Sequence, residues 1–211
     1  MDIPIHPHRP FAVNRPLAFL LLCLVAFLLL FVKKSFIESE TAVFEFLQDR
    51  PEGGFLQLVA ALQFLSIPLI YFWKLTVVAF ILWIGCFLYG YRVTYGQCWM
   101  VALVAEFLFL LPEGLKIFWF MVVDQDPSYH AIRSFYPLSL MHFFDENLAD
   151  KRYAYPLKAL NLFEVAYWGL LTWGIHLYAR KKIKVAGFIV ASSYVLFFLL
   201  WLLFYIAVYK E

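Results

Sequence analysis

Charge is what this 211-residue chain has least of. Only 15% of its residues are Asp, Glu, Lys or Arg, whereas 64% are hydrophobic and the mean hydropathy is +0.77. Soluble globular domains carry about 25% charged residues, so the composition excludes an ordinary soluble fold, and nothing in it indicates a partner of nucleic acid. It predicts a single membrane-embedded helical domain, residues 1–211.

Cysteine and catalytic motifs are equally sparse. The three cysteines, Cys23, Cys86 and Cys98, have no metal or redox spacing. The five histidines are isolated or lie in a Pro-rich N-terminal tail, so a metal site is not expected. The sequence contains no Gly-rich phosphate loop, nucleophile elbow or zinc-binding helix motif. We therefore expect a protein that is not an enzyme and that holds no cofactor.

Long apolar segments separate the few charges. A helix needs roughly 20 apolar residues to cross a hydrocarbon core about 30 Å thick. Five segments are predicted to do so: residues 16–32, 68–90, 98–120, 156–178 and 185–208. The expected fold class is therefore all-α, a polytopic membrane protein with five transmembrane helices.

Three interfacial helices are also expected. Residues 55–91 form one apolar stretch, which at 1.5 Å per residue covers about 55 Å and is too long for one span. Because Pro68 lacks the amide hydrogen that a continuing helix uses, we expect the helix to be divided there, with residues 55–67 lying at the interface. Amphipathic patterns predict further interfacial helices at residues 36–47 and 138–148.

Basic residues collect on one side of this five-span arrangement. The N-terminal segment, the turn at Arg92 and the loop at 180–184 all fall there, and short cytoplasmic loops are enriched in Lys and Arg. The loop contains Arg180, Lys181, Lys182 and Lys184. We interpret these charges as a topology determinant, with binding of anionic lipid headgroups as the alternative. The prediction is a multi-pass protein of the inner (plasma) membrane with a cytoplasmic N-terminus and an external C-terminus.

Four ionisable residues stand out inside the predicted spans. A charge at membrane depth costs at least about 2.5 kcal/mol and usually faces the protein interior. The four are Glu106, Glu113, Lys116 and Glu164. Glu113 and Glu164 lie at similar depths, with Lys116 and Asn161 one turn further outward. If the third and fourth spans are neighbours, Glu113, Lys116, Asn161 and Glu164 form one buried polar layer.

This layer has two interpretations. In the structural interpretation, Glu113 or Glu164 pairs with Lys116 and locks the two helices together. In the functional interpretation, the buried carboxylates relay protons or bind a cation. Glu106 has no partner evident in the sequence and is the better candidate for a proton or cation site. The sequence leaves both interpretations open.

The second half of the chain has features of a known family. They are Tyr89-Gly90-Tyr91 at the end of a span, the turn Gly96-Gln97-Cys98-Trp99, the segment 135–140, and the helix at 159–168 followed by Gly174. With these features, residues 75–211 resemble the Yip1 family of five-span membrane proteins in its bacterial form. Asn161 replaces an acid of the family pattern, and Glu164 is an addition to it.

The resemblance implies an all-α five-span fold with a cytoplasmic N-terminus. Eukaryotic members act in vesicle traffic and contact small GTPases through a long cytoplasmic N-terminal region. Residues 1–15 of this chain are too short a segment for that role, so we do not expect it here. We expect a non-enzymatic scaffold or partner subunit of a membrane assembly, in contact with the lipid bilayer and with other membrane proteins or a second copy of the chain. The alternative is a small transporter or permease subunit that uses Glu106, Glu113 and Glu164 for proton or cation coupling.

Overall fold

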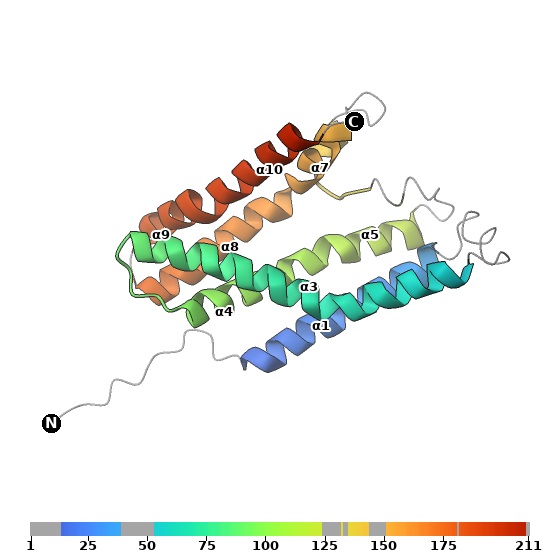
Figure 1. The fold of residues 1–211 in the computed structure, drawn as a ribbon, viewed down its shortest axis with the longest axis horizontal. Helices are drawn as coiled ribbons and strands as arrows, with labels where there is room; N and C mark the ends of the chain where they lie inside the picture. The colour runs from blue at the N-terminus through green and yellow to red at the C-terminus, as the bar shows by residue number, and fades with distance from the viewer. Residues whose placement is uncertain are drawn as a thin grey trace.

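The computed structural model describes residues 14–38, 53–123, 132, 135–143, 151–180 and 182–209. Every regular element within these residues is a helix, which confirms the all-α class for this part of the chain. The long helices run side by side in alternating directions (Figure 1). Within the described residues, strand-like pairing is limited to one isolated antiparallel bridge between Ser139 and Asn161.

Four helical segments of the described chain are long and apolar enough to cross a membrane. They are Arg15–Phe36, Ala61–Leu88, Tyr95–Val122 and Ile183–Val208. The remaining long helix, α8 (Leu162–Ala179), has 18 residues, or about 27 Å, and is not among them. These helices are compatible with an integral membrane protein, and the fifth span stays a prediction.

Helix α1 (Arg15–Val32) begins with a proline in its first turn, where the missing amide hydrogen costs no helical hydrogen bond. It continues as a π-helix, η1 (Lys33–Glu38). α1 packs antiparallel against α3 (Gly53–Leu88), with ring centroids 5.0 Å apart for Phe27 and Phe64. The aromatic pair Phe19 and Phe72, 6.4 Å apart, extends the same contact toward the other end.

The division at Pro68 is wrong. α3 is one helix of 36 residues, and Pro68 lies inside it with an exposed ring. A proline removes only one helical hydrogen bond, and packing of the flanking turns against α1 and the following helix keeps the helix continuous. Residues 55–67 therefore belong to this long helix and do not form a separate interfacial one.

The other two predicted interfacial helices are described only in part. Residues 36–38 continue α1 within η1, and the rest of 36–47 lies outside the described residues. Within 138–148, the described residues form the bridge at Ser139 and a short 3-10 helix, η3 (Leu140–Phe143), while 144–148 lie outside them. Neither interfacial helix is confirmed.

The third predicted span consists of three consecutive segments. They are α4 (Tyr95–Glu106), the 3-10 turn η2 (Phe107–Phe109) and α5 (Leu110–Val122). The α4 start is capped because the Gln97 side chain accepts a hydrogen bond of 2.9 Å from the amide of Thr94. The tighter turn η2 lies just before Pro112, which has no amide hydrogen for the carbonyl of Leu108.

The predicted fourth span, residues 156–178, is not one helix. α7 (Lys151–Ala159) ends before Asn161, and α8 begins there. Asn161 is extended and its Oδ1 accepts a 2.8 Å hydrogen bond from the amide of Glu164, as an N-cap does. Backbone bonds of 3.0 and 3.1 Å tie this break to residues 138–140. The short polar cap, which the apolar periodicity did not reveal, separates the two helices.

The final predicted span, residues 185–208, coincides with a helical path long and apolar enough to cross a membrane. It is made of α9 (Ile183–Val190), the π-turn η4 (Ala191–Val195) and α10 (Leu196–Val208). Its π-turn contains Ser192 and Ser193, whose hydroxyls donate back to carbonyls of the preceding turn. Such side-chain bonds compete with regular α-helical pairing. The widened turn packs closely on α3.

The core lies where α3, α4, α8 and α9 meet. Two glycines permit close helix approach there. A Cβ on Gly174 would lie 2.5 Å from Val101 in α4, and a Cβ on Gly85 would lie 2.7 Å from Ser193 in η4. The core also includes fully buried aliphatic side chains such as Leu82, Leu103 and Leu171.

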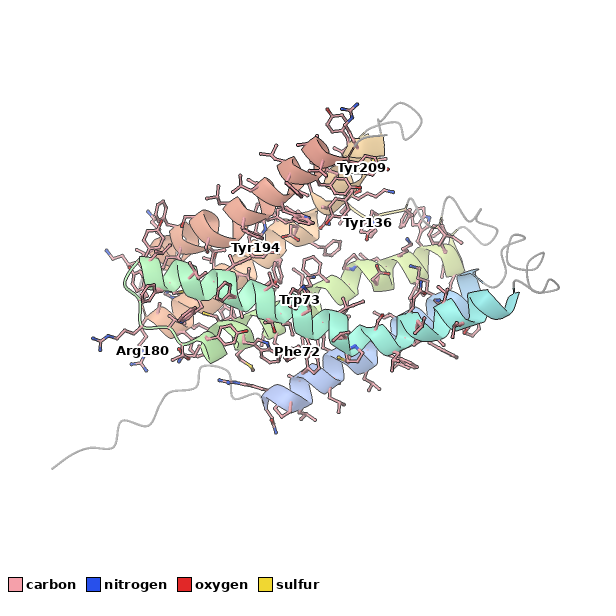
Figure 2. The ribbon with its side chains drawn as sticks, in the orientation of Figure 1. Phe72, Trp73, Tyr136, Arg180, Tyr194 and Tyr209 are labelled. Carbon is pink, nitrogen blue, oxygen red and sulfur yellow. The ribbon has the colours of Figure 1, made fainter. Side chains whose placement is uncertain are left out.

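The turns of the bundle separate into two ends. The start of α1, the α3–α4 turn and the α8–α9 turn lie at one end, whereas the end of α5, α7 and the C-terminal end of α10 lie toward the other (Figure 1). Arg15 sits beside the start of α4, because a Cβ on Gly96 would be 2.9 Å from its guanidinium. Arg180 lies at this same end of the bundle, which we call the basic end, and Tyr209 lies at the opposite end (Figure 2).

Candidate functional site

An ion pair joins α3 to α4 in the interior of the bundle. Lys74 Nζ donates to Glu106 Oε1 at 2.6 Å. The Glu106 side chain is 1% exposed, whereas that of Lys74 is 40% exposed. The Lys74 ammonium also lies 4.2 Å from the centroid of the Phe109 ring, a cation–π contact. Glu106 therefore does have a partner, although the sequence showed none.

A second carboxylate lies on α8. Glu164 is 6% exposed, and its Oε1 accepts hydrogen bonds from Trp168 Nε1 at 2.9 Å and from the Tyr194 hydroxyl at 3.1 Å. Trp168 is one turn along the same helix, while Tyr194 comes from η4. Two neutral donors on one oxygen fix the carboxylate without cancelling its charge.

Aromatic rings connect these two polar groups. Tyr167 is fully buried between Phe109 and Tyr194, with centroid distances of 4.9 and 5.5 Å. Within the described residues, the Tyr167 hydroxyl and Glu106 Oε2 are buried atoms with no hydrogen-bond partner. Buried polar atoms in this state are rare, because each costs about 1–3 kcal/mol. Apolar side chains would fill this part of the bundle without that cost, so the two polar groups are not explained by packing.

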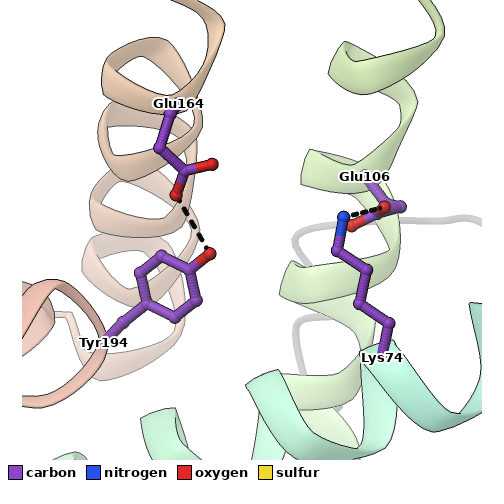
Figure 3. Close-up of polar contacts among 4 residues, drawn as sticks. All are labelled: Lys74, Glu106, Glu164 and Tyr194. Atoms are coloured by element: carbon purple, nitrogen blue, oxygen red, sulfur yellow. Dashed lines mark hydrogen bonds and ion pairs between the residues drawn. The ribbon is translucent and has the colours of Figure 1, made fainter. Parts of the chain in front are cut away.

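Lys74 and Glu164 line the same cavity, of about 590 Å³, from different sides. Figure 3 shows the Lys74–Glu106 pair facing the Glu164–Tyr194 pair, with the second oxygen of Glu164 pointing toward the lysine side. Aromatic side chains, among them Phe198 and Tyr205, form much of the remaining wall. The arrangement presents a positive and a negative group to one aromatic-lined space.

The cavity extends from the middle of the bundle toward the C-terminal end. Tyr194 lies near the middle, and Tyr136 lies closer to that end (Figure 2). Lys158 of α7 also lines the cavity, and the N-cap residue Asn161 contributes to its wall. The cavity therefore lies in the half of the bundle opposite the α3–α4 and α8–α9 turns, which carry Arg92 and Arg180.

A second, apolar cavity of about 320 Å³ adjoins the first. Its wall is formed mainly by leucines of residues 138–140 and 160–162, together with Val165 and Trp168. Asn161 and Glu164 line both cavities. The start of α8 thus separates a polar space from an apolar one.

The four residues of the predicted polar layer fall into two groups. Asn161 and Glu164 are joined directly through the N-cap hydrogen bond. Glu113 and Lys116 lie on α5, with Lys116 buried and its Nζ 5.7 Å from the Tyr136 ring. Burial raises the pKa of the Tyr136 phenol, and the negative charge of Glu113 raises it further. Tyr136 lines the cavity with Asn161 and Glu164, and a single layer of all four remains a prediction.

The basic loop keeps its place at one end of the bundle. Arg180 ends α8 in a left-handed conformation, with φ of 52°, and Lys182 and Lys184 flank the start of α9. Lys181 lies outside the described residues. Their role as a topology determinant, and the alternative of binding lipid headgroups, stay predictions.

Two residues of the site escaped the sequence reasoning for different reasons. Lys74 lies inside the predicted span 68–90, so the criterion that singles out Glu106, an ionisable residue within a span, identifies Lys74 as well. Tyr194 carries no such signal, because tyrosines are common at membrane interfaces and its role depends on η4 meeting α8. The cavity itself has no signature in the sequence.

Within the described residues, no cluster of three or more His, Cys, Asp or Glu could hold a metal ion. No protein-family model, curated protein or solved structure matches the chain. The candidate site is therefore defined by its own geometry: an ion pair, a bonded carboxylate and a cavity that brings them together.

Proposed function

We propose that this chain is a five-span integral membrane protein that works as a small transporter or solute-binding permease subunit. α8 is the fifth crossing helix and packs against α4 and α9. The arrangement keeps the Yip1-like topology, with the basic turns in the cytoplasm and the C-terminus outside. In this orientation the polar cavity faces the outer side of the inner membrane.

One observation carries the proposal: two opposite charges, on Lys74 and Glu164, share a cavity of about 590 Å³ within a bundle of apolar helices. Ionisable residues at membrane depth are costly and typically mark substrate or ion pathways. The volume lies in the range of ligand sites, about 300–1,000 Å³. An ion pair needed only to join α3 and α4 requires neither a 40% exposed lysine nor a second carboxylate across a cavity.

A scaffold or partner subunit is the other candidate from the sequence. Its interface would be sought among the exposed apolar helix faces, such as Leu65, Leu69 and Trp73 of α3. Such faces are equally suited to lipid, since lipid tails are as apolar as leucine side chains. The cavity therefore favours solute binding over a purely structural role.

Accessibility of the cavity provides the first test. In a variant with Cys23, Cys86 and Cys98 replaced by alanine, Lys158→Cys should react with a membrane-impermeant maleimide added outside intact cells. Leu200→Cys is the matched control, because Leu200 is 54% exposed on α10 and is not part of the cavity wall. It should stay unreactive in lipid.

Orientation is tested in the same background. Lys182→Cys should react only after the membrane is permeabilised, because the basic turns are predicted to be cytoplasmic. Reaction of Lys182→Cys from outside would reverse the orientation. Equal protection of Lys158→Cys and Leu200→Cys from both sides would show that water does not enter the cavity, and the transport proposal would fail.

A further inference from the structure

We propose that the cavity recognises a zwitterion, with the ligand's ammonium group at Glu164 and its anionic group at Lys74. The inference rests on the proposed function, because a zwitterion reaches these residues only if the cavity is open to water or to lipid headgroups. It adds the chemical class of the ligand and assigns one charged group of the protein to each end of it.

Glu164 has an oxygen available for an ammonium donor. Both hydrogen bonds of its carboxylate, from Trp168 and Tyr194, go to Oε1. Among the described residues none donates to Oε2, which points toward the lysine side of the cavity (Figure 3). The tyrosine and phenylalanine rings next to this carboxylate, Tyr194 and Phe198, line the same space. A carboxylate beside aromatic faces is a favourable environment for an organic ammonium.

Lys74 has donors available for an anion. An ammonium group carries three N–H donors, and Lys74 uses one of them on Glu106 Oε1. The side chain remains 40% exposed and lines the cavity. Because Glu106 holds the ammonium at 2.6 Å, Lys74 is fixed in position and an anion can share it without moving the lysine. Glu106 is thus a positioning residue and does not touch the ligand.

The charge pattern disfavours ligands with one charge. A simple cation at Glu164 would share the cavity with Lys74 and Lys158, and a simple anion at Lys74 would share it with Glu164. At an effective dielectric constant of about 20, the interaction of unit charges even about 8 Å apart changes an affinity roughly thirtyfold. A ligand with both charges offsets each of these repulsions with an attraction at its other end.

The zwitterion has two possible sources with the same chemistry. It is either a free small molecule, such as an amino acid, or the headgroup of a zwitterionic lipid such as phosphatidylethanolamine. A lipid has a place for an acyl chain, because the apolar cavity of about 320 Å³ shares Asn161 and Glu164 with the polar one. The experiment must therefore contain an arm for each source.

The free-ligand arm uses ω-amino acids whose ammonium and carboxylate groups are separated by increasing lengths: glycine, β-alanine, γ-aminobutyrate and δ-aminovalerate. Binding to the detergent-purified wild-type chain is measured by isothermal titration calorimetry. We expect one length to bind best. Methylammonium and acetate, which carry one charge each, should bind at least about tenfold more weakly, because a charge-assisted hydrogen bond contributes about 1.5–3 kcal/mol.

Two variants assign the ends of the ligand. Glu164→Gln keeps the shape and an oxygen for Trp168 and Tyr194, and it should weaken zwitterion binding about tenfold to a hundredfold. Lys74→Gln combined with Glu106→Gln removes the ammonium assigned to the ligand's anionic group without leaving the buried carboxylate of Glu106 unpaired. It should weaken binding similarly. Tm measured for both variants checks that each is folded.

The lipid arm compares chains extracted from membranes that contain phosphatidylethanolamine and phosphatidylglycerol. Native mass spectrometry should show phosphatidylethanolamine retained by the wild type and lost from Glu164→Gln, while phosphatidylglycerol is not selected by either. Retention with no binding of free ω-amino acids would identify a lipid-borne zwitterion. Binding of the ω-amino acids without selective retention would identify a free one.

The inference is overturned if neither arm shows zwitterion binding, or if methylammonium or acetate binds as tightly as the best ω-amino acid. It is also overturned if folded Glu164→Gln binds like the wild type. When Lys158→Cys is still labelled from outside, these results reject the zwitterion but leave the transport proposal standing. Failure of that labelling as well rejects the cavity on which both depend.

Discussion

Replacing Lys74 by methionine should destabilise the protein far more than replacing its partner Glu106 by glutamine. Methionine keeps most of the length and apolar stem of lysine but removes the ammonium. Glu106, 1% exposed, would then lose the hydrogen bond at 2.6 Å that compensates its buried charge. Breaking a buried pair from one side costs about 3–5 kcal/mol, which is roughly a hundredfold or more in the folding equilibrium.

The reverse substitution leaves a different group behind. In Glu106→Gln the Lys74 ammonium remains, but it is 40% exposed and contacts the Phe109 ring at 4.2 Å. Because it keeps much of its solvation, we expect a loss of about 1–2 kcal/mol. The double variant Lys74→Met/Glu106→Gln has no unpaired buried charge. It should therefore be more stable than Lys74→Met alone.

The measurement is the free energy of unfolding in mixed micelles, obtained by titration with sodium dodecyl sulfate and followed by tryptophan fluorescence. The four chains, wild type, two single variants and the double variant, form a double-mutant cycle. Equal losses for Lys74→Met and Glu106→Gln would refute the reasoning from unequal burial. A double variant as unstable as the sum of the single ones would show that the pair is not coupled.

Two other substitutions test packing and the break before α8. Gly174→Ala places a Cβ 2.5 Å from Val101 and should cost about 1–3 kcal/mol of stability. The control, Gly169→Ala on the same helix, meets nothing within 4 Å and should be neutral or stabilising. Both are measured as Tm in detergent. Asn161→Ala removes the 2.8 Å hydrogen bond that caps the amide of Glu164, and should cost about 1 kcal/mol of stability. Asn161→Asp keeps a capping oxygen and should restore that stability. An alanine variant as stable as the wild type would contradict the role of the cap.

The all-α class and most of the long apolar helices follow from the sequence alone. Hydropathy is a property of consecutive residues, so the apolar paths at 15–36, 95–122 and 183–208 are recognisable without knowing what they contact. The start of α1, the α3–α4 turn and the α8–α9 turn, which carry Arg15, Arg92 and Arg180, lie at one end of the bundle (Figure 1). This grouping likewise follows from the number of segments between them.

Local rules failed where neighbouring helices determine the outcome. Pro68 reads as a helix break, yet contacts with α1 and α4 keep α3 continuous through it. Asn161 reads as the interior of a span, yet its side chain caps α8 beside the bridge to Ser139. Around both residues most side chains are apolar, so the hydrophobic pattern does not indicate whether the helix continues or ends there.

Only the tertiary structure determined the candidate site. Lys74 and Glu106 are separated by 32 residues, and Glu164 and Tyr194 by 30. Which of these side chains meet depends on how each helix is rotated about its axis, and chains rich in apolar residues on all sides give that rotation almost no amphipathic signal. Packing at small residues such as Gly85 and Gly174 sets it instead, because close approach of the backbones fixes which faces of the helices touch.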